Sequence, residues 1–134
     1  MDAFNPASIN PPFGHYSHGV DIGPGARWLH LSGQVGVNPA GDLLDGLAAQ
    51  TEQAFANIDA ILTEAGYTRA DLVKVTTFLV ARAGEVNTDD VAAYRDVRNQ
   101  YLGPNKPTST LLVVAGLADP KWLIEIEAIA AKVE

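Results

Sequence analysis

The sequence of 134 residues contains no cysteine. Its absence excludes disulfide bonds, zinc sites built from thiolates and cysteine nucleophiles. Basic residues are also few, nine against sixteen acidic residues, which gives a net charge of −7. Proteins that bind nucleic acids usually carry a basic stripe, and this sequence has none. The acidic excess therefore argues against nucleic acids and anionic membranes as partners and favours a soluble protein.

Long apolar runs are absent too. No stretch reaches the roughly 18 residues that a membrane span needs. The first residues, Met1 to Pro6, have neither the basic nor the apolar region of a signal peptide, so we expect a cytoplasmic protein. Hydrophobic residues make up 47% of the chain and charged residues 19%, an ordinary balance for one globular domain over residues 1–134.

The three histidines do not form the pattern of a metal site. His15 and His18 are three residues apart near the start of a predicted strand, where side chains alternate between faces, and His30 lies in the next strand. No His-Glu-x-x-His helix and no cluster of carboxylates accompanies them. We therefore predict no metal site.

The order of the apolar segments predicts an α+β fold. Residues 1–15 are rich in Pro, Asn and Gly and are expected to form an irregular arm. The predicted elements are strands at 16–23 and 27–32, a helix at 46–65, a strand at 72–81, a helix at 88–102 and strands at 109–115 and 122–131. This order favours one mixed sheet with both helices on one face. Identical subunits commonly cover the other face, so we expect an oligomer.

Local signals mark the ends of these elements. The turn Gly23-Pro24-Gly25 joins the first two predicted strands. Asp45 is the expected N-cap of the first helix, and Gly66 is placed for a left-handed C-terminal cap.

The residues alone leave two features open to more than one interpretation. In the last predicted strand Glu125 and Glu127 share a face opposite the apolar alternation. They form either a solvated acidic face or, if an interface covers one of them, a carboxyl group whose pKa is raised by burial and suits acid–base work. Ser32, followed by Gly33, is a structural turn residue or a nucleophile by residue type only, because no Gly-x-Ser-x-Gly elbow surrounds it.

Six segments, in order, resemble the reactive-intermediate deaminase (RidA/YjgF) family. They are His15-Tyr16-Ser17-His18-Gly19-Val20, Leu31-Ser32-Gly33-Gln34-Val35, Asn38-Pro39-Ala40-Gly41-Asp42-Leu43, and the ranges 50–58, 73–79 and 124–130. The resemblance covers about residues 11–131. It implies a chorismate-mutase-like, RidA-like α+β subunit and a homotrimer with three small-molecule clefts between subunits.

The resemblance also implies an activity. Members of the family hydrolyse reactive enamines and imines, such as 2-aminoacrylate and 2-iminobutanoate, to 2-keto acids and ammonia, without a metal or an organic cofactor. By matching motif, Glu125 would position the attacking water. Tyr16 and Ser32 would line the pocket, Gly33 would allow close backbone approach, and backbone groups near Leu111 would meet the ligand.

The chain departs from the family pattern at the group that grips the substrate carboxylate. The family's Pro-Ala-Arg-Ser reads Pro107-Thr108-Ser109-Thr110 here, so Ser109 stands in the place of the arginine. A serine offers one neutral donor where a guanidinium offers five donors and a charge, a loss of roughly 1.5–3 kcal/mol in binding.

Two interpretations of the pocket follow from this departure. Arg95 and Arg98 occupy the places of the family's Asn-x-x-Tyr in the second helix, and one of them restores the charge, unless both face solvent or form interface salt bridges. Otherwise the pocket takes an uncharged or differently charged molecule, with hydroxyls from Thr108, Ser109 and Thr110 bonding a carbonyl, amide or carbamate.

Three functions are compared on this basis. The first is hydrolysis of a small enamine, imine or related C–N metabolite. The second is a non-catalytic trimer that binds a metabolite or a partner protein in the same clefts. A ribonuclease activity, sometimes attached to the family, is the weakest because the chain is acidic and lacks catalytic placement of its histidines.

Overall fold

A mixed four-stranded sheet and two helices form the body of the protein, in a computed structural model that describes all 134 residues. The strands are β3 (Arg27–Val35), β4 (Leu72–Val80), β5 (Thr108–Val114) and β6 (Ile124–Lys132), and the helices are α1 (Leu47–Glu64) and α2 (Thr88–Leu102), with a short 3-10 turn η1 (Arg69–Asp71). The strand order is β3-β6-β4-β5. Only β4 and β5 are parallel, so the predicted mixed α+β sheet is confirmed.

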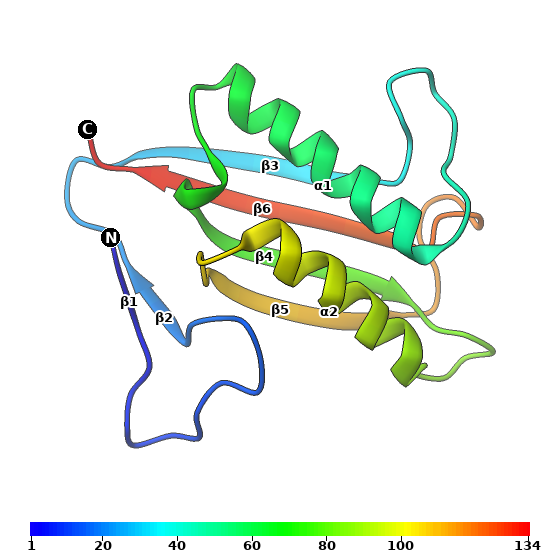
Figure 1. Ribbon diagram of the computed structural model, residues 1–134, viewed down its shortest axis with the longest axis horizontal. Helices are drawn as coiled ribbons and strands as arrows, with labels where there is room; N and C mark the ends of the chain where they lie inside the picture. The colour runs from blue at the N-terminus through cyan, green and yellow to red at the C-terminus, as the bar shows by residue number, and fades with distance from the viewer.

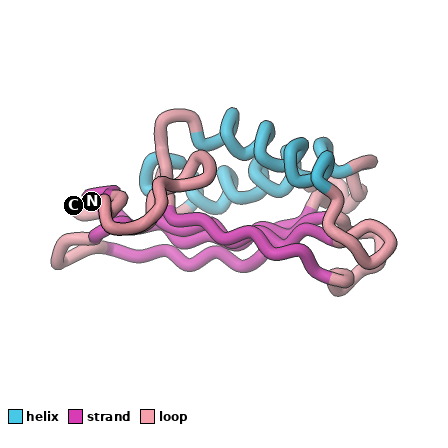
Figure 2. The backbone as a smooth tube through the Cα atoms, turned by 90° about the horizontal axis from the view of Figure 1, so that it is seen from below, coloured by secondary structure: helices cyan, strands magenta, loops and turns pink.

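Both helices lie on the same face of the sheet (Figure 2). Helix α1 lies over β3 and β6, and α2 lies over β4 and β5 (Figure 1). Because β4, α2 and β5 form a parallel β-α-β unit, α2 runs antiparallel to both of its strands. Neither helix is long and apolar enough to cross a membrane.

The ends of α1 follow the sequence signals at one end only. The predicted N-cap at Asp45 is wrong, because the cap position is Gly46, with a φ of 87° that glycine adopts without strain and no side chain to cap the helix. The predicted glycine cap at the other end is confirmed. Gly66 has a φ of 78°, and the Tyr67 amide donates to the Leu62 carbonyl at 2.8 Å, as in a Schellman motif.

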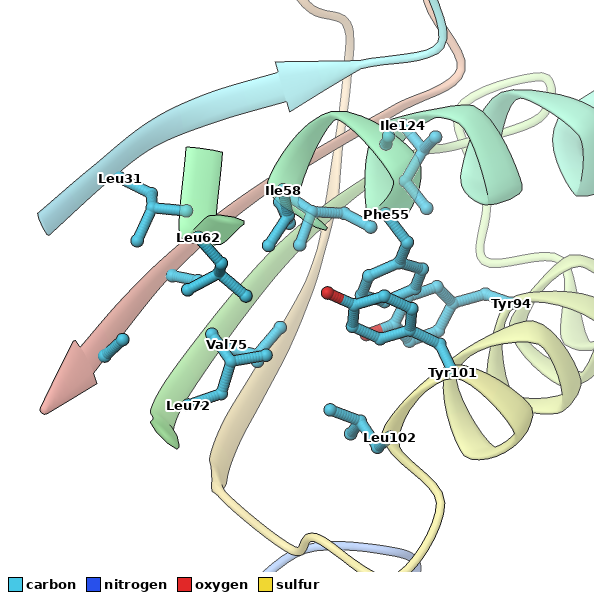
Figure 3. Close-up of a cluster of buried hydrophobic side chains, with 14 of the residues drawn as sticks. Leu31, Phe55, Ile58, Leu62, Leu72, Val75, Tyr94, Tyr101, Leu102 and Ile124 are labelled. Carbon is cyan, nitrogen blue, oxygen red and sulfur yellow. The ribbon is translucent and has the colours of Figure 1, made fainter. Parts of the chain in front are cut away.

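The core fills the space between the sheet and the helices (Figure 3). Its largest fully buried side chains are Tyr94, Phe55, Ile58, Leu62, Leu72, Ile124, Ile126 and Val75. Phe55 of α1 stacks on Tyr101 of α2, with ring centroids 4.2 Å apart. Each of these large apolar side chains contributes about 1.5–3 kcal/mol by leaving water, so this layer holds the helices in place.

The N-terminal arm differs from the prediction. Residues 1–15 were expected to be irregular, but Asp2–Phe4 form strand β1, which pairs antiparallel with β2 (Gly19–Asp21) in a separate two-stranded sheet. The strand expected over 16–23 is shortened to β2, and it does not pair with β3. Phe4 lies opposite Gly19, whose missing side chain leaves room for the phenyl ring.

The other face of the sheet carries no helix (Figure 2). Polar and apolar side chains are mixed on it, and two large ones, Trp28 at 50% and Leu112 at 41% exposure, remain open to solvent. Within one chain this face is therefore uncovered, as the sequence predicted.

Candidate functional site

Glu125 projects from β6, a central strand, onto the uncovered face of the sheet. Its neighbours Ile124 and Ile126 point the other way and are fully buried, so strand alternation fixes the direction of the carboxylate. Glu125 is in register with Val35 on β3, and just before Val35 the regular pairing of β3 with β6 breaks between Leu31 and Gln34. This irregularity contains Gly33, and a Cβ on that glycine would overlap Oε1 of Glu125.

An open hollow of about 360 Å³ lies beside this carboxyl group. It is lined by Gly33, Phe78, Val114, Gly116, Leu117, Glu125 and Glu127. A second hollow of about 380 Å³ on the same face includes Ser32, with Lys74 and His30 among its other lining residues. The structure thus brings Glu125 and Gly33 into one hollow and places Ser32 beside the next one.

The three hydroxyl-bearing residues predicted to act together at the start of β5 point to different faces of the sheet. Ser109 is in register with buried Val75, and Leu111 packs against the core, so both side chains are on the helix side. Thr108 and Thr110 alternate with them and face the opposite side. The three hydroxyls therefore do not converge on one point.

The Thr108 hydroxyl is already engaged. It donates to the backbone carbonyl of Val73 at 2.8 Å. This bond fastens the beginning of β5 to the beginning of β4, which gives Thr108 a structural role.

Tyr16 lies close to the same end of β5. The Ser17 amide donates to the Pro107 carbonyl at 3.2 Å and so attaches the arm to the residue before the strand. The Tyr16 hydroxyl accepts a hydrogen bond from the Phe13 amide at 3.1 Å. Phe13 itself is 82% exposed, and its sequence context gave no reason to single it out.

The two arginines of α2 have different surroundings. Arg95 is exposed, whereas Arg98 is only 4% exposed, so the solvent-facing interpretation is wrong for Arg98. Its Nε and Nη2 atoms donate to Oδ1 of Asn99 at 3.2 and 3.0 Å, and its guanidinium carbon lies 5.6 Å from the ring centroid of Tyr94.

Two polar side chains of α1 that the sequence analysis did not select, buried Gln50 and half-buried Asn57, hold the strands that carry the site. Gln50 of α1 accepts a hydrogen bond from the Leu123 amide at 2.9 Å, directly before β6. Asn57 donates to the carbonyls of Val35 and Val37, both at 3.1 Å, just after the irregular part of β3. Polar residues on the apolar face of a predicted helix were the available signal.

The predicted site residues form two separate groups within one chain. Glu125 is opposite Phe78 on β4, and Phe78 is opposite Leu112 on β5. Ser109 is therefore two strands across and three residues along, roughly 14 Å away by standard strand spacings. Tyr16, Ser109 and Arg98 line none of five surface hollows on the molecule, whereas Glu125 lines one of them.

No three His, Asp or Glu side chains come together as potential metal ligands.

Comparisons with known proteins give a consistent result. A RutC family protein of Pyrococcus horikoshii is 38% identical over 124 residues, covering 90% of both chains. The 2-iminobutanoate/2-iminopropanoate deaminase of Homo sapiens is 36% identical over 128 residues, covering 93% of this chain and 82% of that protein. A crystal structure of a Rid family protein from Yersinia pestis has a TM-score of 0.83 and 37% identity, covering 98% of each chain.

The structure of TdcF from E. coli, determined with bound serine, is similar at a TM-score of 0.71 and 29% identity, covering 98% of this chain and 94% of that one. The family described as Endoribonuclease L-PSP matches residues 7–132. The chain therefore belongs to this family, which includes the RidA/YjgF and RutC proteins.

Proposed function

We propose that the protein is a homotrimeric hydrolase of a small enamine or imine, in which Glu125 positions the attacking water. The observation that carries this proposal is the Glu125 carboxyl group, held against Gly33 and open to a hollow on the uncovered sheet face. A carboxylate with one side fixed and the other side open is suited to hold a water molecule.

The proposed reaction needs only proton transfers. The Glu125 carboxylate accepts a proton from water as the water oxygen bonds to the imine carbon, and Glu125 passes this proton to the nitrogen. The remaining hydroxyl proton moves to the nitrogen by the same route during the next step. The tetrahedral intermediate then collapses: the carbon–nitrogen bond breaks, ammonia leaves, and the oxygen becomes the carbonyl of the keto product. An enamine reaches the same path after protonation at its carbon. General acid–base assistance of this kind typically contributes about 10²–10⁴-fold in rate.

A second subunit completes the proposed site. The residues near Ser109 and those near Glu125 lie two strands apart in one chain and on opposite sides of the sheet. A neighbouring copy packed on the uncovered face brings the β5 end of one subunit to the Glu125 hollow of the next. This arrangement also covers Trp28 and Leu112.

The alternative is a non-catalytic trimer that binds a small metabolite in the same cleft. Two observations favour it: serine replaces the family's arginine at position 109, and the related TdcF has been crystallised with bound serine. In such a protein an amino acid or keto acid would occupy the cleft and would not be consumed.

A kinetic experiment decides between the two. Generate 2-aminoacrylate or 2-iminobutanoate in the cuvette and measure its rate of loss with and without the protein. The wild type is expected to accelerate the loss, and Glu125→Gln to remove about 10²-fold or more of that acceleration. Glu64→Gln is the matched control, because Glu64 is exposed at the end of α1 on the other side of the sheet. A folded trimer that leaves the loss rate unchanged supports the binder.

A further inference from the structure

Arg98 differs from the other arginines because its side chain is buried and has no carboxylate as a counter-ion. Three arginines form ion pairs: Arg27 with Glu134, Arg69 with Asp59 and Arg82 with Asp90. The side chains of these three are 48%, 50% and 67% exposed. Arg98 is 4% exposed and pairs with no carboxylate.

The hydrogen bonds of Arg98 leave much of its capacity unused. Two of its nitrogens share one neutral oxygen, Oδ1 of Asn99. Its third nitrogen, Nη1, makes no hydrogen bond. Tyr67 Oη is the only fully buried side-chain nitrogen or oxygen atom that lacks a hydrogen-bond partner, so Nη1 is not fully buried and remains accessible to solvent. A desolvated charge without an anion is costly, and its free edge is where an anion would be most strongly bound.

The position of Arg98 along the sheet follows from the hydrogen bond between Tyr94 and Thr77. The two hydroxyls are 2.6 Å apart, and Thr77 is in register with Leu111. Helix α2 runs antiparallel to β5, so the four residues from Tyr94 to Arg98 advance the helix by about 6 Å. Two residues back along β5, about 6.6 Å, lead from Leu111 to Ser109. Arg98 is therefore level with Ser109.

The N-terminal arm closes the other side of this region. A Cβ on Gly14 would lie 3.7 Å from Nη2 of Arg98, and the arm is attached to the start of β5 through Ser17 and Pro107. Burial raises the pKa of the Tyr94 hydroxyl, and the nearby positive charge of Arg98 lowers that pKa by a smaller amount. The guanidinium thus has Asn99, Tyr94 and the arm at Gly14 beside it, and no carboxylate within ion-pair distance.

We propose that Arg98 binds the carboxylate of a small 2-imino or 2-keto acid and so makes the ligand of this protein an anion. The inference rests on the proposed function, because it takes the same cleft between subunits as its site. The guanidinium reaches the ligand from helix α2, across from Ser109. The ligand carboxylate supplies the counter-ion that the buried guanidinium lacks. The substrate is then an amino-acid-derived imine and not an uncharged amide or carbamate.

Binding without turnover tests this assignment. Measure the affinity for 2-oxobutanoate and for its neutral amide, 2-oxobutanamide, by titration calorimetry. The wild type is expected to bind the carboxylate at least tenfold more tightly than the amide, and Arg98→Gln to lose roughly 10- to 150-fold in carboxylate affinity while amide binding stays constant. Lys106→Gln is the matched control, because it removes an exposed positive charge near the same strand and should change neither affinity.

Two further measurements keep the outcome decisive. Arg98→Lys keeps the charge and loses the fork, and an intermediate affinity is expected. If neither variant folds, the comparison of carboxylate with amide in the wild type still decides. Equal affinity for the two ligands, or unchanged carboxylate binding in folded Arg98→Gln, overturns the inference. Arg98-dependent binding in a protein that does not hydrolyse imines instead rejects the proposed catalysis and leaves the anion site standing.

Discussion

The carboxyl group of Glu125 occupies the space that a side chain at position 33 would fill. The irregular pairing of β3 with β6 and the absence of a Cβ at Gly33 together hold this carboxyl group at the edge of the hollow. The position of the proposed general base therefore depends on a glycine that is itself unable to react.

Replacing Gly33 by alanine tests this dependence. The new methyl group must displace the Glu125 carboxyl, and a misplacement of about 1 Å commonly costs on the order of 10² in rate. We expect kcat for imine loss to fall while the protein remains folded. Gly23→Ala is the control, because a Cβ there meets nothing within 4 Å. Equal kcat values for both variants would show that Gly33 does not position Glu125.

The buried hydrogen bond between Tyr94 and Thr77 predicts a non-additive effect on stability. Either Tyr94→Phe or Thr77→Val leaves one buried hydroxyl without its partner, at a cost of about 1–3 kcal/mol in the free energy of unfolding. The double variant removes both polar groups and should cost less than the sum. Urea titrations of the four proteins give the coupling energy, and strictly additive values would mean that the bond is not formed in solution.

Tyr101 predicts a loss of stability in alkaline solution. Burial, helped by its hydrogen bond to Asp59, raises the pKa of this phenol above the ordinary value of 10.0. Above about pH 10 the unfolded chain releases this proton while the folded chain keeps it, so the free energy of unfolding falls as pH rises. We expect this fall to be less steep in Tyr101→Phe, measured by urea titration from pH 8 to 11. Parallel curves would contradict the assignment.

Restoring an arginine on β5 should depend on Arg98. In Ser109→Arg the new guanidinium is level with Arg98, and the two like charges oppose each other. Imine hydrolysis should therefore rise more when Ser109→Arg is introduced into the Arg98→Gln background than into the wild type, as measured by kcat/KM for a carboxylate-bearing imine. An identical gain in both backgrounds would place the two side chains in separate regions.

The sequence predicted the layered fold well because its signals there are strong. The alternation around Glu125 and the glycine after α1 act within a few residues, and both are confirmed. Strand β1 was missed because it has three residues and its partner is far along the chain. The cap at Gly46 was missed because a glycine conformation replaced a side-chain cap.

The candidate site was predicted as a set of residues but not as an arrangement. The register of β5 separates Ser109 from Thr108 and Thr110, and this register depends on pairing with β4, which no local pattern reveals. The burial of Arg98 likewise depends on the arm folding back beside it, a contact between residues more than eighty positions apart.

Mixed trimers test the central claim most directly, that each site uses Glu125 from one subunit and the Arg98 region from the next. Glu125→Gln and Arg98→Gln subunits, each expected to hydrolyse carboxylate-bearing imines poorly alone, are co-refolded in equal amounts. Random assembly then creates clefts with both native residues at about one interface in four, so about a quarter of the wild-type rate should return. No recovery above the rates of the separate variants would contradict a site shared between subunits.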